Sequence, residues 1–138
     1  MFSSSNCALS LVVAVLVDRG LLDYDERITA YWPEFEENGK GDVTLADVLR
    51  HESKLPFLDK CMEQSDFLRS NLKANAVGRY IEALAPHWSS NVDWRYYHSV
   101  TRGLILNEVV RRVDPKSRTI GEVFYEEVIC SQIAICFV

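Results

Sequence analysis

The spacing of hydrophobic residues along the chain predicts a fold made mainly of helices. Residues 8–17 form an apolar run, ALSLVVAVLV, with serines before it and Gly20 after it. A serine at position 3, 4 or 5 suits a helix N-cap, and glycine suits a left-handed C-terminal residue. We therefore expect a helix over residues 5–19 that is buried on most sides. The valines of this run would also suit a strand, and from this segment alone that alternative stays open.

Further segments carry helical signals. Thr44 is followed by Asp47 at capping-box spacing, and a helix with one apolar face follows. Hydrophobic positions recur at three and four residues over 66–84 and 99–113, and Thr119 opens a last helix. The positions expected to face the core are Leu45, Val48, Leu49, Phe67, Leu68, Leu72, Ala76, Val77, Tyr80, Ile81, Leu84, Val100, Leu104, Leu106, Val109 and Val110.

Polar segments rich in helix breakers separate these helices. Residues 21–42 contain a proline and two glycines, and we expect a loop there with a short helical turn near residues 26–31. Residues 87–96 are polar and aromatic and predict a surface loop. The last ten residues, ICSQIAICFV, are apolar and have no regular period. These patterns indicate a mainly α chain with few strands.

Composition and charge narrow the class of protein. The chain has 138 residues, of which 48% are hydrophobic and 25% charged, as in a single globular domain. Its net charge of −5 argues against nucleic acid as a partner, because phosphate binding needs a basic surface. Residues 8–17 are too short to span a bilayer, which takes about 20 apolar residues. They also lack the basic flank and the cleavage site of a signal peptide, although a secretory signal remains the alternative.

The cysteines and acidic residues give no sign of a metal site. Cys7, Cys61, Cys130 and Cys136 are scattered, with no CxxC pair and no histidine at zinc-ligand spacing. Idle or buried thiols fit a reducing compartment, which favours the cytoplasm. The acidic clusters at 23–26 and 34–37 lack the pattern of a calcium loop, so we interpret them as solvated. No cofactor is expected.

Three stretches in the right order resemble the serine β-lactamase-like hydrolases, which include class C β-lactamases, D-alanyl-D-alanine carboxypeptidases and related carboxylesterases. The first, FSSSNCALSLVVAVLVDRGLLDYDERITAYWPEF, is similar to the family's nucleophile helix and its Y-W-P-E-F passage. The second, GKGDVTLADVLRHESKLP, is similar to I-T-[VI]-x-x-L-L-x-H-x-S-G-L-P. The third, YYHSVTRGLILNEVVRRVDPKSRTIGEVFYEEV, resembles the helix that follows Y-x-[NS]. The resemblance covers residues 2–128.

The resemblance implies an acyl-enzyme mechanism, in which the serine of S-x-x-K attacks a carbonyl and the lysine one turn later exchanges its proton. Ser3 matches the nucleophile, Tyr97 the tyrosine of the acid–base network, and Ser99 the third position of Y-x-S. Asn6 fills the lysine position, and an amide cannot accept a proton near neutral pH. Lys54 stands where the second motif has glycine.

Two histidines near these motifs are not expected to be catalytic bases. His51 belongs to a passage that is structural in the family, and His98 occupies the variable middle position of Y-x-S. For Ser3 the competing interpretation is a helix cap, and for Tyr97 a half-exposed aromatic residue at the start of a helix.

The resemblance also implies that much of the family's fold is missing. The family's domain is well over twice as long, and its sheet is built from strands before the nucleophile helix and after the third motif. We therefore expect a partial β-lactamase-related domain over residues 1–128 and a divergent tail over residues 129–138. The expected fold class is a mainly α fragment of the α/β (α+β) β-lactamase/transpeptidase-like fold. Apolar helix faces left uncovered would promote self-association.

The favoured functional interpretation is a truncated member of this family without competent catalysis. One alternative is a weak serine esterase or amidase that acts through an acyl-enzyme on Ser3. Another is a non-catalytic helical module that binds a longer relative. The substrate, an ester or an amide if the chain is active, is not specified by the sequence.

Overall fold

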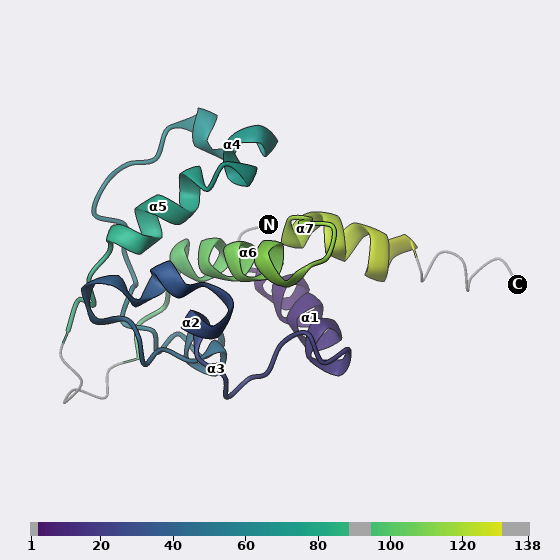
Figure 1. Cartoon of the computed structure of the whole chain (residues 1–138), viewed down its shortest axis with the longest axis horizontal. Coiled ribbons are helices and arrows are strands. Elements are labelled where there is room, and N and C mark those ends of the chain that lie inside the picture. Colours follow the sequence, from purple (N-terminus) through teal and green to yellow (C-terminus); the bar gives the residue numbers. More distant parts are fainter. Residues whose placement is uncertain (1–2, 89–94, 131–138) are drawn as a thin grey trace, which may run out of the picture.

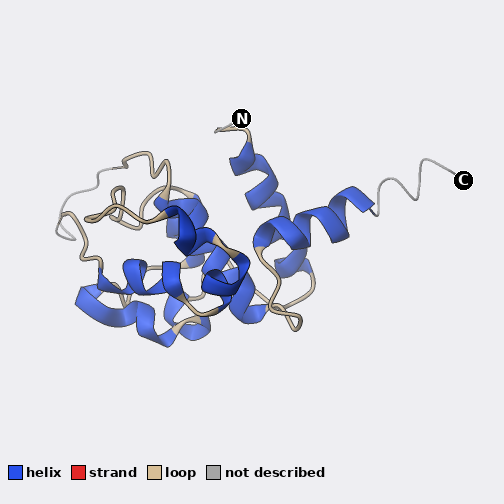
Figure 2. Cartoon of the chain, turned by 90° about the horizontal axis from the view of Figure 1, so that it is seen from above, coloured by secondary structure: helices blue, strands red, loops and turns tan. Residues whose placement is uncertain are grey.

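The structure is a computed structural model that describes residues 3–88 and 95–130. In these two ranges helices dominate, and the one strand-like pairing is an isolated antiparallel bridge between Arg27 and Thr44 (Figure 2). The expected mainly α fold is confirmed. Most of the predicted surface loop at 87–96, and residues 131–138 of the apolar tail, lie outside the described residues.

The helices surround a central one, α6. The α-helices are α1 (Ser5–Asp18), α2 (Ile28–Tyr31), α3 (Leu45–Leu49), α4 (Arg69–Lys73), α5 (Ala76–Ala83), α6 (Thr101–Val113) and α7 (Ile120–Val123). The 3-10 segments η1 (Pro33–Gly39) and η2 (Gln64–Phe67) join them, and the π-helical turn η3 (Phe124–Ile129) extends α7. Figure 1 shows α6 crossing the middle of the molecule, and it contacts α1, α2, α3, α5 and α7.

The hydrophobic core lies between α6 and its neighbours. Its members on the two longest helices are Val12, Val13, Leu16, Ile105, Leu106, Val109 and Val110, and all are at most 1% exposed. Trp32 and Phe35, at the junction of α2 and η1, are fully buried. Burying one such side chain stabilises a protein by about 1.5–3 kcal/mol. This core fixes α1 against α6.

Helix α1 follows the predicted bounds but not the predicted cap or burial. Ser4 occupies the N-cap position with helical φ and ψ of −67° and −25°, and it makes no side-chain cap hydrogen bond. An N-cap needs an extended backbone to bring its side-chain oxygen to the third helical N–H. The helix is buried along one stripe, and Leu11 is 46% exposed. The expectation of burial on most sides was wrong, whereas the left-handed Gly20, with φ of 69°, is confirmed.

Local capping signals predicted two helix starts correctly. The Thr44 hydroxyl accepts a hydrogen bond from the Asp47 N–H at 3.2 Å, and the Asp47 carboxylate accepts one from the Thr44 N–H at 2.9 Å. Thr119 and Glu122 form the same reciprocal pair at the start of α7. Val100 was expected in the core but is 51% exposed, because it precedes the first turn of α6.

Residues 66–84 were expected to form one helix, and they form three short ones. The chain changes direction at Asn75, whose φ of 63° is left-handed, and α5 begins after it. A β-carbon on Gly78 would lie 1.9 Å from Asn75 Oδ1, so a larger residue at position 78 would have to displace the Asn75 side chain. Phe67 and Leu68 fall before the break and remain 46% and 58% exposed. The part of the pattern after Asn75 does face the core, as Val77 and Ile81 are fully buried, whereas the turn leaves the part before it outside the core.

Candidate functional site

Ser3 and Tyr97 meet where α1 packs beside α6. Ser3 lies in the turn before α1, and Tyr97 lies in the segment that leads into α6. The Tyr97 hydroxyl donates to Ser3 Oγ at 3.5 Å, which is longer than the usual 2.7–2.8 Å of hydroxyl pairs. Tyr97 is 47% exposed and Ser3 is exposed, so solvent reaches both oxygens.

Asn6 joins the pair from the first turn of α1. Its Nδ2 donates to the Tyr97 hydroxyl oxygen at 2.9 Å, and its Oδ1 accepts from Arg102 Nη1 at 2.9 Å. A guanidinium has only donors, so this contact fixes the amide orientation, with oxygen toward Arg102 and nitrogen toward Tyr97. The position that the family motif gives to a lysine therefore presents an N–H group to Tyr97.

Arg102 is the member of this cluster that the sequence did not indicate. It lies in the first turn of α6, is 4% exposed, and also donates to Ser10 Oγ at 2.8 Å and to the Leu49 carbonyl at 3.4 Å. Burial lowers the pKa of Arg102. No motif marks position 102, and its relation to Asn6 arises only when α1 and α6 pack together.

Ser99 stands apart from the other candidates. It is exposed and forms no hydrogen bond with Ser3, Asn6 or Tyr97 in the part of the chain that the structure describes. The structure therefore brings three of the four candidate residues together.

The two histidines lie behind Tyr97 and bond elsewhere. The rings of His51 and Tyr97 lie 4.8 Å apart, and His51 Nδ1 accepts a hydrogen bond from the His98 N–H at 3.1 Å. Burial, and then the charge of Arg102, lower the pKa of His51. His98 is 1% exposed, and its Nε2 lies 3.2 Å from Ser53 Oγ. Among the described contacts, no ring nitrogen of His51 or His98 is hydrogen-bonded to Ser3. The expectation that neither histidine is the base of Ser3 stays a prediction, and the geometry is consistent with it.

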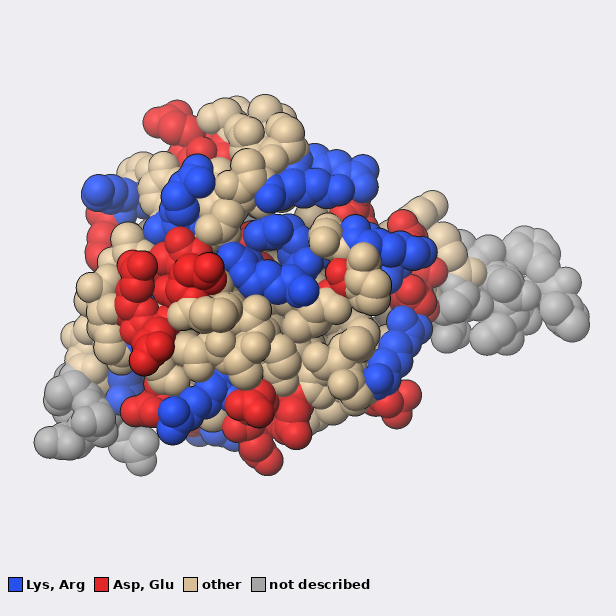
Figure 3. Space-filling model, viewed as in Figure 1, with Lys and Arg blue, Asp and Glu red and all other residues tan. Residues whose placement is uncertain are grey.

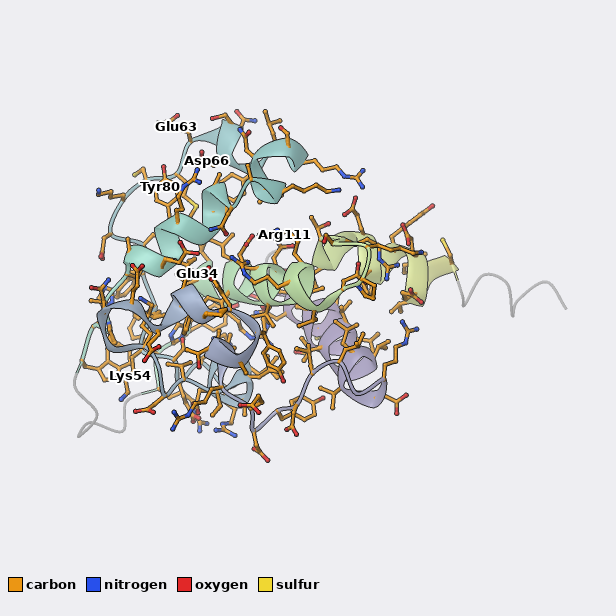
Figure 4. The ribbon with its side chains drawn as sticks, in the orientation of Figure 1. Glu34, Lys54, Glu63, Asp66, Tyr80 and Arg111 are labelled. Atoms are coloured by element: carbon orange, nitrogen blue, oxygen red, sulfur yellow. The ribbon has the colours of Figure 1, made fainter. Side chains whose placement is uncertain are left out.

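Lys54 adopts the conformation of the glycine that it replaces. Its φ is 63°, in the left-handed region where a β-carbon is unfavourable and glycine is not. The resemblance placed a glycine at this position, and the backbone explains why. Figure 4 shows Lys54 at the edge of the molecule, on the loop after α3.

A cavity of about 450 Å³ lies away from this cluster. It opens between α5 and the segment 58–60, and none of Ser3, Asn6, Tyr97 and Arg102 lines it. Tyr80 and Asp66 on its wall lie close together in Figure 4.

On the face in Figure 3, basic and acidic side chains are interspersed. No group of three metal-binding side chains occurs in residues 3–88 and 95–130, and no helix there is long and apolar enough to cross a membrane.

Comparison with known proteins places these features in a family. The Beta-lactamase family model matches residues 1–130. The esterase/beta-lactamase LipL of Mycobacterium tuberculosis is 31% identical over 120 residues, which are 84% of this chain and 25% of LipL.

Solved structures agree with the sequence match. A penicillin-binding protein homolog from Caulobacter crescentus aligns with a TM-score of 0.77 and 32% identity, covering 93% of this chain and 33% of that one. A family VIII carboxylesterase aligns with a TM-score of 0.78 and 34% identity over the same shares. EstA from Arthrobacter nitroguajacolicus Rue61a aligns with a TM-score of 0.76 and 32% identity, covering 91% and 32%.

The chain spans a quarter of the curated relative and about a third of each solved structure that it matches. Its helices therefore correspond to one part of the β-lactamase/transpeptidase-like fold, as the resemblance implied. On the family match over residues 1–130, the chain belongs to the β-lactamase family.

Proposed function

We propose that this chain is a member of the β-lactamase family in which Ser3 does not form an acyl-enzyme at neutral pH. The observation that carries the proposal is the Asn6 amide, which donates to Tyr97 and accepts from Arg102. A nucleophilic serine needs a neighbouring base to take its proton, and a carboxamide has no basic nitrogen.

The direction of the hydrogen bonds supports this proposal. The Tyr97 oxygen accepts from Asn6, and its single proton is directed at Ser3. In this arrangement Ser3 Oγ is the acceptor of the contact, so Tyr97 offers no acceptor to the serine proton. His51 contacts Tyr97 through its ring, and His98 is hydrogen-bonded to Ser53 and Leu55.

The alternative function is weak esterase or amidase activity through an acyl-enzyme on Ser3. The contact between Ser3 Oγ and the Tyr97 hydroxyl favours it. Its length of 3.5 Å exceeds the roughly 2.6–3.2 Å of proton transfer, but catalytic contacts of this kind often shorten when a substrate binds. LipL and the family VIII carboxylesterase bear names of esterases, which makes an ester the substrate class to test first.

The test is covalent labelling of the purified chain at neutral pH. It is incubated with a fluorophosphonate or a penicillin, and the Ser3 peptide is examined by mass spectrometry. We expect no adduct on the wild-type chain. An adduct that Ser3→Ala abolishes would refute the proposal and support the alternative. Labelling of Asn6→Lys but not of the wild type would assign the defect to residue 6, provided that circular dichroism shows the same helix content.

A further inference from the structure

The cavity beside α5 combines an apolar lining with charged side chains. It has a volume of about 450 Å³ and opens between α5 and the segment 58–60. That volume lies within the roughly 300–1,000 Å³ of small-molecule pockets. The apolar part of the lining is Leu58, Ala76, Ala83 and Leu84, and the polar part is Asp59, Lys60, Asp66, Arg79 and Tyr80. Such a lining suits a ligand with an apolar body and one polar end.

The two carboxylates of the lining already face protein groups. Asp66 Oδ2 accepts a hydrogen bond from the Glu63 N–H at 3.0 Å, which caps η2, and the Asp66 side chain is also hydrogen-bonded to Tyr80. The charge of Asp66 raises the pKa of Tyr80, so the phenol keeps its proton and donates it to the carboxylate. Asp59 Oδ1 lies 3.8 Å from Nε2 of His87. The acidic side of the cavity is therefore used within the fold.

The two cations of the lining have no such partners. In residues 3–88 and 95–130, neither Lys60 nor Arg79 forms an ion pair with a carboxylate. Arg79 Nη1 donates to the Ala74 carbonyl at 3.3 Å, and the other donors of its guanidinium stay available to a ligand. Lys60 lies on the segment 58–60 and Arg79 on α5, so the two charges come from opposite sides of the cavity mouth. The unused charge of the cavity is positive.

We propose that this cavity binds a small carboxylic acid as its anion, with the apolar body inside and the carboxylate between Lys60 and Arg79. A carboxylate accepts hydrogen bonds at both oxygens, and a guanidinium and an ammonium can donate to it together. The inference goes beyond the proposed function and does not rest on it, because neither Ser3 nor Tyr97 lines the cavity.

The lining also argues against a cation as the ligand. A cation at Asp66 would compete with the hydrogen bonds from Glu63 and Tyr80, and their loss costs stability. The Asp59 side chain is 58% exposed, so a pair formed there is screened by water and weak. Lys60 and Arg79 are exposed too, and each adds only modestly to binding. Most of the affinity must therefore come from burial of the apolar body.

The experiment titrates 4-phenylbutyrate into the ¹⁵N-labelled full chain at neutral pH and follows the backbone amides by NMR. Two further probes, 4-phenylbutan-1-ol and 4-phenylbutylamine, carry the same apolar body with a neutral and a cationic end. Comparing the three probes measures the contribution of the ligand's charge. The positions of the shifted amides locate the site independently of any substitution.

Two kinds of variant test the residues. Lys60→Met and Arg79→Met each remove one charge, and Lys73→Met is their control, because Lys73 is an exposed lysine on α4 outside the lining. Ala83→Phe places a large side chain in the cavity. Its control is Ala85→Phe, because Ala85 is exposed and does not line the cavity. All five positions other than Lys73 lie near one another in the chain or on α5, and their exposure makes each substitution compatible with the fold.

We expect 4-phenylbutyrate, with about twelve non-hydrogen atoms, to bind with a Kd of about 1 mM and to shift the amides of the lining. The alcohol should bind about tenfold more weakly, and the amine more weakly still. Lys60→Met and Arg79→Met should each weaken binding of the carboxylate about threefold, Ala83→Phe should abolish it, and both controls should leave it unchanged.

The opposite results would overturn the inference. Shifts centred outside the cavity lining, or no shifts at millimolar 4-phenylbutyrate, would show that this is not the site. An amine that binds as tightly as the carboxylate, or a Kd that neither Lys60→Met nor Arg79→Met changes, would refute the assigned charge. Each of these outcomes leaves the proposed function intact, since covalent labelling of Ser3 tests that separately.

Discussion

His98 makes the stability of this fold sensitive to mild acid. Its ring is 1% exposed, and burial lowers its pKa to about 4 from the usual 6.5. The Leu55 N–H donates to Nε2 at 3.1 Å, so that nitrogen must keep its lone pair. A proton added there would face an N–H donor inside the core, and it would have to displace that hydrogen bond.

The size of the effect follows from the difference between the folded and unfolded pKa values. The folded pKa is the lower one, so the stabilisation is fully present above pH 6.5 and is lost as the pH falls toward 4. From these two values, the free energy of unfolding should decrease by about 2 kcal/mol between pH 7 and pH 5. By pH 4 the loss should reach about 3 kcal/mol, of the 5–15 kcal/mol typical of small proteins.

Urea denaturation at several pH values, followed by circular dichroism, measures this loss. His98→Gln is the matched variant, because a glutamine amide oxygen can accept hydrogen bonds from Leu55 and Ser53 and does not titrate. We expect the wild type to lose about 2 kcal/mol more than His98→Gln between pH 7 and pH 5. The comparison also removes the contribution of His51, which both proteins share. Equal losses in the two proteins would refute the assignment to His98.

Three other predictions concern single side chains. Lys54→Gly should raise the free energy of unfolding by about 1 kcal/mol in urea denaturation, because a φ of 63° disfavours a β-carbon; a loss of stability would contradict this. Lys40→Met should lower the free energy of unfolding by about 3 kcal/mol, because the buried ammonium of Lys40 donates to three backbone carbonyls. A loss below about 1 kcal/mol would contradict this prediction. Exposed apolar side chains such as Leu11 and Tyr125 predict self-association, so Leu11→Glu should reduce the mass found by light scattering. A monomeric wild-type chain would contradict that prediction.

The sequence predicted those elements whose signals are local. Thr44 with Asp47, and Gly20 after α1, act within one turn of the chain, and each marks a helix end in the structure. The break inside residues 66–84 depends instead on Asn75, a residue type that enters the left-handed region more readily than most but does not require it. Its conformation is accommodated by Gly78, and the Arg112 guanidinium, 2.7 Å from Asn75 Oδ1, holds its side chain. That last contact joins α6 to the start of α5, and no local pattern reveals it.

The candidate site could likewise be predicted only in part from the sequence. The resemblance to the family's motifs pointed to Ser3, Asn6 and Tyr97, and the structure brings these three side chains together. It could not identify Arg102, which is 96 residues from Asn6 in the chain and reaches it through helix packing. The two positions nevertheless constrain each other.

This constraint changes how the absent lysine is understood. Asparagine at position 6 supplies the acceptor that the buried guanidinium of Arg102 needs, whereas a lysine ammonium there would bring a second cation to a site without a carboxylate. Asn6→Lys therefore removes an acceptor and adds a like charge in one step. A failure of that variant to react would carry information about the missing base only if Arg102→Met were introduced with it. The chemistry of position 6 in this chain is thus set by position 102 as much as by the serine motif to which it belongs.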